Sequence, residues 1–137
     1  MHVEDTIAAP VARITASAPV LLVRDVVASA HHYRDVAGFE VVQLYGEPAE
    51  FGICRRDDHY LMLARTDPIH INPHWQIRKA TCNAYFWVDD ADGLHAEMKA
   101  AGATIDYGPC TQPFGVREFG IRDLDGYDIS FGQILKG

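Results

Sequence analysis

The sequence predicts an α+β fold made of two similar βαβββ modules, and the first observation behind this prediction is an internal repeat. The segment VRDVVASAHHYRDVAGFEV begins at Val23 and the segment VDDADGLHAEMKAAGATI begins at Val88, 65 positions later. The glycines that end these segments, Gly38 and Gly102, are 64 positions apart. The second observation is that three β-rich runs follow each segment. The third is size, because 137 residues that are 48% hydrophobic can bury a core as one domain or as two small fused modules.

Each repeated segment predicts a helix with its own start and stop signals. Asp25 and Asp90 suit the N-cap, and Gly38 and Gly102 suit the left-handed position after the last turn. Apolar residues recur at three- and four-residue steps, which predicts one buried face for each helix. The expected buried positions are Val26, Ala30, Tyr33 and Ala37, then Ala91, Leu94, Met98 and Ala101, with His95, Glu97 and Lys99 toward solvent.

Alternating or β-branched and aromatic runs predict the strands that follow the helices. The first module supplies FEVVQLY, EFGICRR and HYLMLA, and the second supplies ATIDY, GVREFGI and YDISFG. RDDH at 56–59 and DLDG at 123–126 predict the turns before the last strands. The predicted organisation is a tail at 1–17, a module at about 18–65, an irregular linker at 66–81 with two prolines, and a module at about 82–133.

The same alternation predicts which side chains face away from the helices. In the strand that opens the second module, Ala84, Phe86 and Val88 form the hydrophobic set. Their neighbours Asn83, Tyr85 and Trp87 are therefore expected to face a cleft. In the last two strands the apolar residues suit the core, which leaves four further cleft residues, namely Glu118, Arg122, Asp128 and Ser130.

Charge and composition exclude several classes of function. The formal charge is −7, from 19 acidic and 12 basic residues without a Lys/Arg cluster, which argues against nucleic-acid binding. The excess acid accommodates a cationic ligand, or alternatively only keeps the domain soluble. No apolar stretch is long enough to span a membrane and no signal peptide is evident, so a cytoplasmic protein is expected. Three separated cysteines, Cys54, Cys82 and Cys110, indicate neither disulfides nor a cysteine zinc site.

The stretches APVLLVRDVVASAHHYRDVAGFEV, NAYFWVDDADGLHAEMKAAGA and FGVREFGIRDLDGYDISFGQ resemble the vicinal oxygen chelate superfamily, which includes glyoxalase I, extradiol dioxygenases and fosfomycin and bleomycin resistance proteins. The resemblance covers about residues 18–133. It implies a single domain over 1–137, in which two curved mixed sheets surround a cleft and carry their helices on the outer faces. A fold by itself gives no reaction.

Metal enzymes of this superfamily hold a divalent ion through histidine or glutamate on the first, fourth, fifth and eighth strands. The resemblance places Ala18, Asn83 and Ser130 at three of these positions, and YLMLAR has no carboxylate at the fourth. Alanine cannot ligate, and neutral Asn and Ser oxygens hold Zn, Fe or Ni poorly. We therefore expect no metal. His70 and His74 are four apart but flank Pro73 in the linker, which disfavours a helical metal pair.

FGVREFGIRD and the terminal FGQ are especially similar to the bleomycin resistance proteins, homodimers that sequester a large cationic aromatic antibiotic between subunits. The resemblance implies a metal-free homodimer, without cofactor or catalytic residues, that binds a bleomycin-like or other aromatic small molecule. Trp75 on the linker and Phe114 in the QPFG loop add stacking surfaces. The expected ligand-binding residues are Trp87, Tyr85, Asn83, Trp75, Phe114, Glu118, Arg122, Asp128 and Ser130.

Alternatives remain at each level. Trp87 could complete the contact between modules, Trp75 could cover an edge strand, and Phe114 could anchor its loop. Glu118 and Arg122 could pair with one another, and Asp128 could be an ordinary solvated carboxylate. For the whole protein, the alternatives are a lyase, isomerase or dioxygenase with a rearranged metal site using His70 or His74, a cofactorless catalyst, and an accessory module whose cleft binds another protein.

Overall fold

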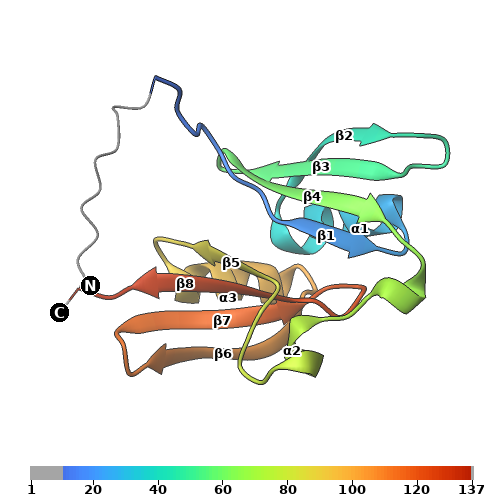
Figure 1. Ribbon diagram of the computed structural model, residues 1–137. Coiled ribbons are helices and arrows are strands. Elements are labelled where there is room, and N and C mark those ends of the chain that lie inside the picture. The colour runs from blue at the N-terminus through green and yellow to red at the C-terminus, as the bar shows by residue number, and fades with distance from the viewer. Residues whose placement is uncertain (1–10, 137) are drawn as a thin grey trace, which may run out of the picture.

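The computed structural model describes residues 11–136 and contains two four-stranded sheets of identical topology (Figure 1). Sheet 1 has the order β1-β4-β3-β2 and consists of β1 (Val20–Val23), β2 (Glu40–Tyr45), β3 (Phe51–Arg56) and β4 (His59–Arg65). Sheet 2 has the order β5-β8-β7-β6 and consists of β5 (Ala84–Trp87), β6 (Thr104–Gln112), β7 (Val116–Arg122) and β8 (Asp128–Ile134). In each sheet the first and fourth strands are parallel and the other neighbours antiparallel. The predicted α+β class and the two βαβββ modules are confirmed.

Each module has one long helix on one face of its sheet, α1 (Val26–Ala37) in module 1 and α3 (Ala91–Ala100) in module 2. The Asp25 side chain accepts from the Ala28 amide, and Asp90 accepts from the Gly93 amide, as N-caps do. Gly38 takes the left-handed conformation after α1, at φ 73°. The predicted buried face of α1 is confirmed at all four positions.

The prediction for α3 is wrong at two positions. Ala101 is exposed, because the helix ends at Ala100 and the chain turns away there. His95 is half-buried, and its ring lies edge-on to Phe119 at 5.3 Å between centroids. It belongs on the inner face because it lies four residues after buried Ala91 and three before buried Met98.

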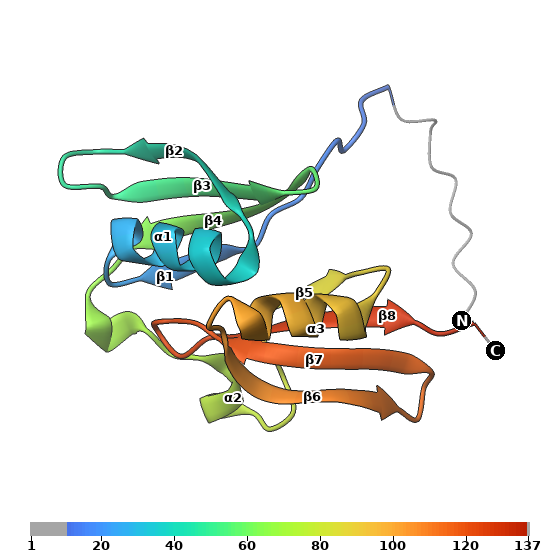
Figure 2. The ribbon, with the colours of Figure 1, turned by 180° about the vertical axis from the view of Figure 1, so that it is seen from behind.

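Both modules contribute to one hydrophobic core. Figure 2 shows α1 and α3 on the same side of the molecule, and Figure 1 shows the helix-free faces of both sheets on the other side. Phe39 of module 1 meets Phe86 of module 2 at 6.0 Å between ring centroids, and Phe86 stacks on Phe131 at 5.8 Å. The side of each sheet that lies away from α1 or α3 is called its open face below.

The β7–β8 turn also joins the modules. Its buried carboxylates contact α1 and the residues before it: the Tyr33 hydroxyl donates to Asp123 at 2.5 Å, and Arg24 Nε pairs with Asp125 at 2.9 Å. The Tyr127 hydroxyl donates to the carbonyl of Leu22. Burial raises the pKa of Asp123 to about 6, while the hydrogen bond from Tyr33 opposes that rise.

The linker at 66–81 is mostly irregular, as expected, but includes η1 (Pro68–His70) and the single turn α2 (His74–Ile77). Part of the predicted tail, residues 1–10, lies outside the described residues. No helix between residues 11 and 136 is long and apolar enough to cross a membrane.

Candidate functional site

The open faces of the two sheets have the same topology and opposite chemistry. Rows of residues that pair across sheet 1 are nearly all apolar: Val20, Met62, Ile53 and Gln43 form one row, and Leu22, Ala64, Phe51 and Tyr45 the next. The corresponding rows of sheet 2 are Tyr85, Ser130, Gly120 and Tyr107, then Trp87, Gly132, Glu118 and Cys110. The candidate site is therefore the open face of sheet 2.

Two glycines let tyrosine side chains lie flat on this face. A Cβ atom at Gly132 would overlap the hydroxyl of Tyr85, and one at Gly120 would overlap the ring of Tyr107 and lie 2.8 Å from Asp128 Oδ1. Neither glycine has positive φ, so the requirement here is space and not backbone conformation.

The tyrosines belong to a hydrogen-bonded network that includes two acidic groups. The Tyr85 hydroxyl donates to Glu118 Oε2 at 2.6 Å, and Gln112 Nε2 donates to Glu118 Oε1 at 2.9 Å. The Tyr107 hydroxyl donates to Ser130 Oγ at 3.0 Å. Ser130 in turn donates to Asp128 Oδ1 at 2.9 Å. Such a network fixes the orientation of every member before any ligand arrives.

Burial determines the charge of this network. Asp128 is only 4% exposed, and burial, followed by its hydrogen bond to the carboxyl group of Asp106, raises its pKa to about 7. The alternative of a solvated carboxylate is thus excluded. Burial and the hydrogen bond to Glu118 raise the pKa of Tyr85, which keeps its hydroxyl protonated as a donor.

The linker covers one end of the face. The Arg122 guanidinium pairs with Asp106 at 2.9 Å and lies 3.8 Å from the ring centroid of Trp75. Trp75 Nε1 donates to the carbonyl of Gly126 at 2.6 Å, which fixes the indole. Arg122 therefore does not pair with Glu118, the alternative that the sequence left open.

The other predicted residues lie at the margins. Trp87 is 62% exposed, with its ring 4.9 Å from that of Tyr85 and inclined by 60°. Asn83 precedes β5, and its side-chain oxygen accepts from the His74 amide at 3.1 Å, so it holds the linker. Phe114 occupies the β6–β7 turn, is 70% exposed, and takes no part in the hydrogen-bonded network.

Three residues of the site, Tyr107, Asp106 and Gln112, were not predicted from the sequence. Simple alternation after Ile105 places Tyr107 on the helix side. A register shift between Ile105 and Tyr107 in the β6–β7 pairing brings both Asp106 and Tyr107 to the open face. Gly108, with φ 80° and a cis bond to Pro109, marks a second irregularity in β6, and this GP pair was the available sequence signal.

No group of three His, Cys, Asp or Glu side chains within residues 11–136 is arranged to hold a metal ion. At the superfamily's ligand positions, Ser130 and Asn83 use their side-chain oxygens in the hydrogen bonds described above. His74 Nδ1 contacts the Cys82 carbonyl oxygen at 3.1 Å. His70 lies in η1 and is exposed.

Paired βαβββ modules, each with one open sheet face, define the vicinal oxygen chelate class of folds. The chain belongs to the Glyoxalase/Bleomycin resistance protein/Dioxygenase superfamily, because the model of that family matches residues 12–131. Comparison with curated protein sequences gives no match.

Solved structures share this fold over nearly their whole length. TioX from Micromonospora sp. ML1 is 23% identical, with a TM-score of 0.70 over 88% of this chain and 99% of the other. TnmS3, an antibiotic binding protein from Streptomyces sp. CB03234, is 21% identical, with a TM-score of 0.69 over 91% and 99%. The bleomycin-binding protein from Streptomyces verticillus, solved with copper(II)-bleomycin, is 26% identical, with a TM-score of 0.61 over 92% and 99%.

Proposed function

We propose that this protein is a metal-free, homodimeric, cytoplasmic binding protein that sequesters a large aromatic, cationic small molecule of the bleomycin-like kind without changing it chemically. The observation that carries the proposal is the open face of sheet 2, where aromatic side chains and buried carboxylates are held by hydrogen bonds on the side of the sheet away from α3. Structural similarity to proteins described as antibiotic binding and bleomycin-binding supports a small-molecule ligand.

The charge of the face favours a cation. Glu118 is 8% exposed, and both of its oxygens already accept hydrogen bonds. Its carboxylate is therefore held in place against the hydroxyl of Tyr85, whose ring lies 4.9 Å from that of Trp87. Arg122 offsets Asp106, so the face remains negative overall. A flat cation would stack on the exposed indole of Trp87, and the carboxylate of Glu118 would attract its charge.

The open face of sheet 1 supports the homodimer. Val20 is 50% exposed, Leu22 44% and Tyr45 49%, within the apolar rows described above. Both open faces lie on the same side of the molecule. A two-fold axis can therefore place sheet 1 of each copy over sheet 2 of the other copy, which forms two equivalent contacts. Each ligand site would then lie between an acidic, aromatic wall and an apolar wall.

Titration with bleomycin tests the proposal, with tryptophan fluorescence as the readout because Trp75 and Trp87 are the only two tryptophans. A saturable change at micromolar concentration is expected. Glu118→Gln preserves an acceptor for Tyr85 but removes the charge, so affinity should fall about three- to tenfold. Glu50→Gln, at an exposed position in the β2–β3 connection, is the matched control and should change nothing.

Two results would count against this function. One is the absence of a saturable response to bleomycin and to other large aromatic cations. The other is a stoichiometric transition metal in protein purified without chelator, which would point to a metal-dependent enzyme of the same superfamily.

A further inference from the structure

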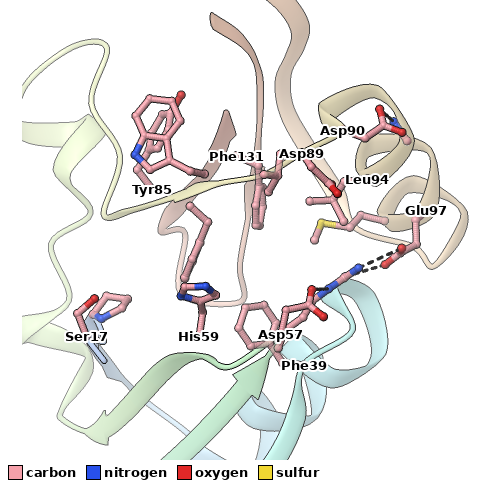
Figure 3. Close-up of a pocket in the computed structure, with 17 residues that line it drawn as sticks. Ser17, Phe39, Asp57, His59, Tyr85, Asp89, Asp90, Leu94, Glu97 and Phe131 are labelled. Atoms are coloured by element: carbon pink, nitrogen blue, oxygen red, sulfur yellow. Dashed lines mark hydrogen bonds and ion pairs between the residues drawn. The ribbon is translucent and has the colours of Figure 1, made fainter. Parts of the chain in front are cut away.

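A cavity of about 760 Å³ lies between the two modules (Figure 3). The edge strand β5 separates it from the centre of the open face of sheet 2. Most of its walls come from the β3–β4 turn, from β5, from α3 and from the segment that precedes β1. It reaches the candidate site only at Tyr85 and Trp87. Its volume falls within the range of small-molecule sites, about 300 to 1,000 Å³.

The cavity exists because the internal repeat is imperfect. At the equivalent place in the other half of the molecule, the β7–β8 turn fills the space against α1 with buried Asp123, Asp125 and Tyr127. The β3–β4 turn is shorter, with only Asp57 and Asp58 between the strands, at φ 50° and 65°. The α3 residue at the repeat position of Tyr33 is Met98, 65 positions later, which has no hydroxyl to anchor a turn.

The inner wall is apolar and aromatic. Figure 3 shows Phe39, Leu94 and Phe131 around the space. Phe39 and Phe131 each contact the ring of Phe86, which also lines the cavity. These rings provide flat surface and no hydrogen-bonding partner, which suits an aromatic ligand.

The rim is acidic. Four carboxylates line the cavity, those of Asp57, Asp89, Asp90 and Glu97, against the single arginine Arg56. Arg56 already donates to Glu97 at 2.7 Å and to the Ala37 carbonyl at 2.8 Å, and it lies 3.5 Å from Asp57. The four carboxylates and the one arginine give the cavity lining a formal charge of −3. Within residues 11–136 no ion pair neutralises Asp89.

We propose that this inter-module cavity is a second binding site, complete within one chain, for a small flat organic cation such as a single charged ring system. Apolar rings enclose the body of the ligand, and the carboxylates at the rim attract its charge. This site shares Tyr85 and Trp87 with the sheet 2 face but lies on the other side of β5, and it needs no second copy of the chain because all its walls belong to one molecule.

Proflavine, a flat cation, is the probe, and its uncharged parent acridine, at mildly alkaline pH, is the matched neutral probe. Binding is mapped by backbone amide chemical shifts and quantified by calorimetry. Asp89→Asn should weaken proflavine about three- to tenfold and leave acridine unchanged. Leu94→Trp should fill the cavity and abolish binding of both, while circular dichroism shows the fold intact. Asp58→Asn is the control, since Asp58 neighbours Asp57 but does not line the cavity.

Variants of the other site separate this proposal from the proposed function. Glu118→Gln should leave the cavity titration unchanged, and Leu94→Trp should leave bleomycin binding unchanged. The cavity proposal is overturned if no saturable proflavine shifts occur around residues 57, 89 and 94. It is equally overturned if Asp58→Asn weakens binding as much as Asp89→Asn, because general attraction to an acidic protein would then suffice.

Discussion

Replacing Tyr33 by phenylalanine tests the polar contact that joins the two modules. The hydroxyl donates at 2.5 Å to Asp123, a carboxylate that is only 9% exposed. The other oxygen of Asp123 accepts from the amides of Asp125 and Tyr127 at 3.0 and 2.9 Å, so the variant loses one of three hydrogen bonds. A hydrogen bond to a charged group contributes about 1.5 to 3 kcal/mol, and we expect unfolding free energy to fall by ~2 kcal/mol near neutral pH.

The expected change in melting temperature follows from chain length. With about 2.1 cal/mol/K of unfolding entropy per residue, the chain unfolds with ~0.3 kcal/mol/K, so a loss of ~2 kcal/mol lowers Tm by ~7 °C. Urea unfolding and thermal melts followed by far-ultraviolet circular dichroism measure both quantities. Tyr45→Phe is the control, because this tyrosine is 49% exposed and should cost less than about 0.5 kcal/mol.

The pH dependence sharpens the test. The folded pKa of Asp123, about 6, exceeds its ordinary value of 3.8, so its protonation stabilises the fold at low pH and that contribution is lost as pH rises through about 6. Without the Tyr33 donor the folded pKa should rise further, because an interaction with the charged form is gone. The deficit of Tyr33→Phe should therefore be larger at about pH 8 than at about pH 5. A deficit below about 0.5 kcal/mol, or one independent of pH, would refute this account of the contact.

Three further outcomes are expected. Asp128→Asn should reduce the fall in stability that the wild type shows in urea unfolding between about pH 4 and pH 7, since the folded pKa of Asp128 is raised to about 7 and only the part due to Asp123 remains; an unchanged slope contradicts this. Gly132→Ala should displace Tyr85 and weaken bleomycin binding at least as much as Tyr85→Phe does in the fluorescence titration; wild-type affinity would show that the tyrosine position is irrelevant. Leu22→Asp should convert dimer to monomer in sedimentation analysis, and a persistent dimer would move the interface away from sheet 1.

The sequence was sufficient for the fold because its signals are local and repeated. The caps Asp25 and Asp90 and the apolar spacing of α1 each specify structure within a few residues. Two such modules in sequence then leave few ways to bury both helix faces. The faces of β5, β7 and β8 were predicted correctly too, since the β5–β8 and β7–β8 pairings have no register shift and the side chains alternate strictly from Tyr85 to Trp87 and from Glu118 to Arg122.

The partners of the site residues were harder to predict. The sequence places Asp128 in the cleft, but in a chain of charge −7 nothing near it indicates that this acid is buried. Its burial depends on Tyr107 and Asp106, which reach the open face only because the β6 register shifts. Trp75 likewise lies over Arg122 through a long linker whose path no periodicity specifies. Contacts between residues far apart in the sequence, made through a β-bulge and a linker, do not follow from the local pattern of apolar and polar residues.

Two small differences from an exact repeat account for the different roles of the two modules. On sheet 2, Gly132 and Gly120 allow the side chains of Tyr85 and Tyr107 to lie across the sheet and cover carboxylates that would otherwise be solvated. The corresponding positions of sheet 1 hold Ile53 and Ala64 beside Val20 and Leu22, so nothing there needs a polar partner. A face of the first kind can orient a ligand, whereas a face of the second kind can only exclude water from it. The two sheets thus share one topology but have complementary open faces. Pairing two copies of the chain is the simplest way to place the open face of sheet 1 against that of sheet 2.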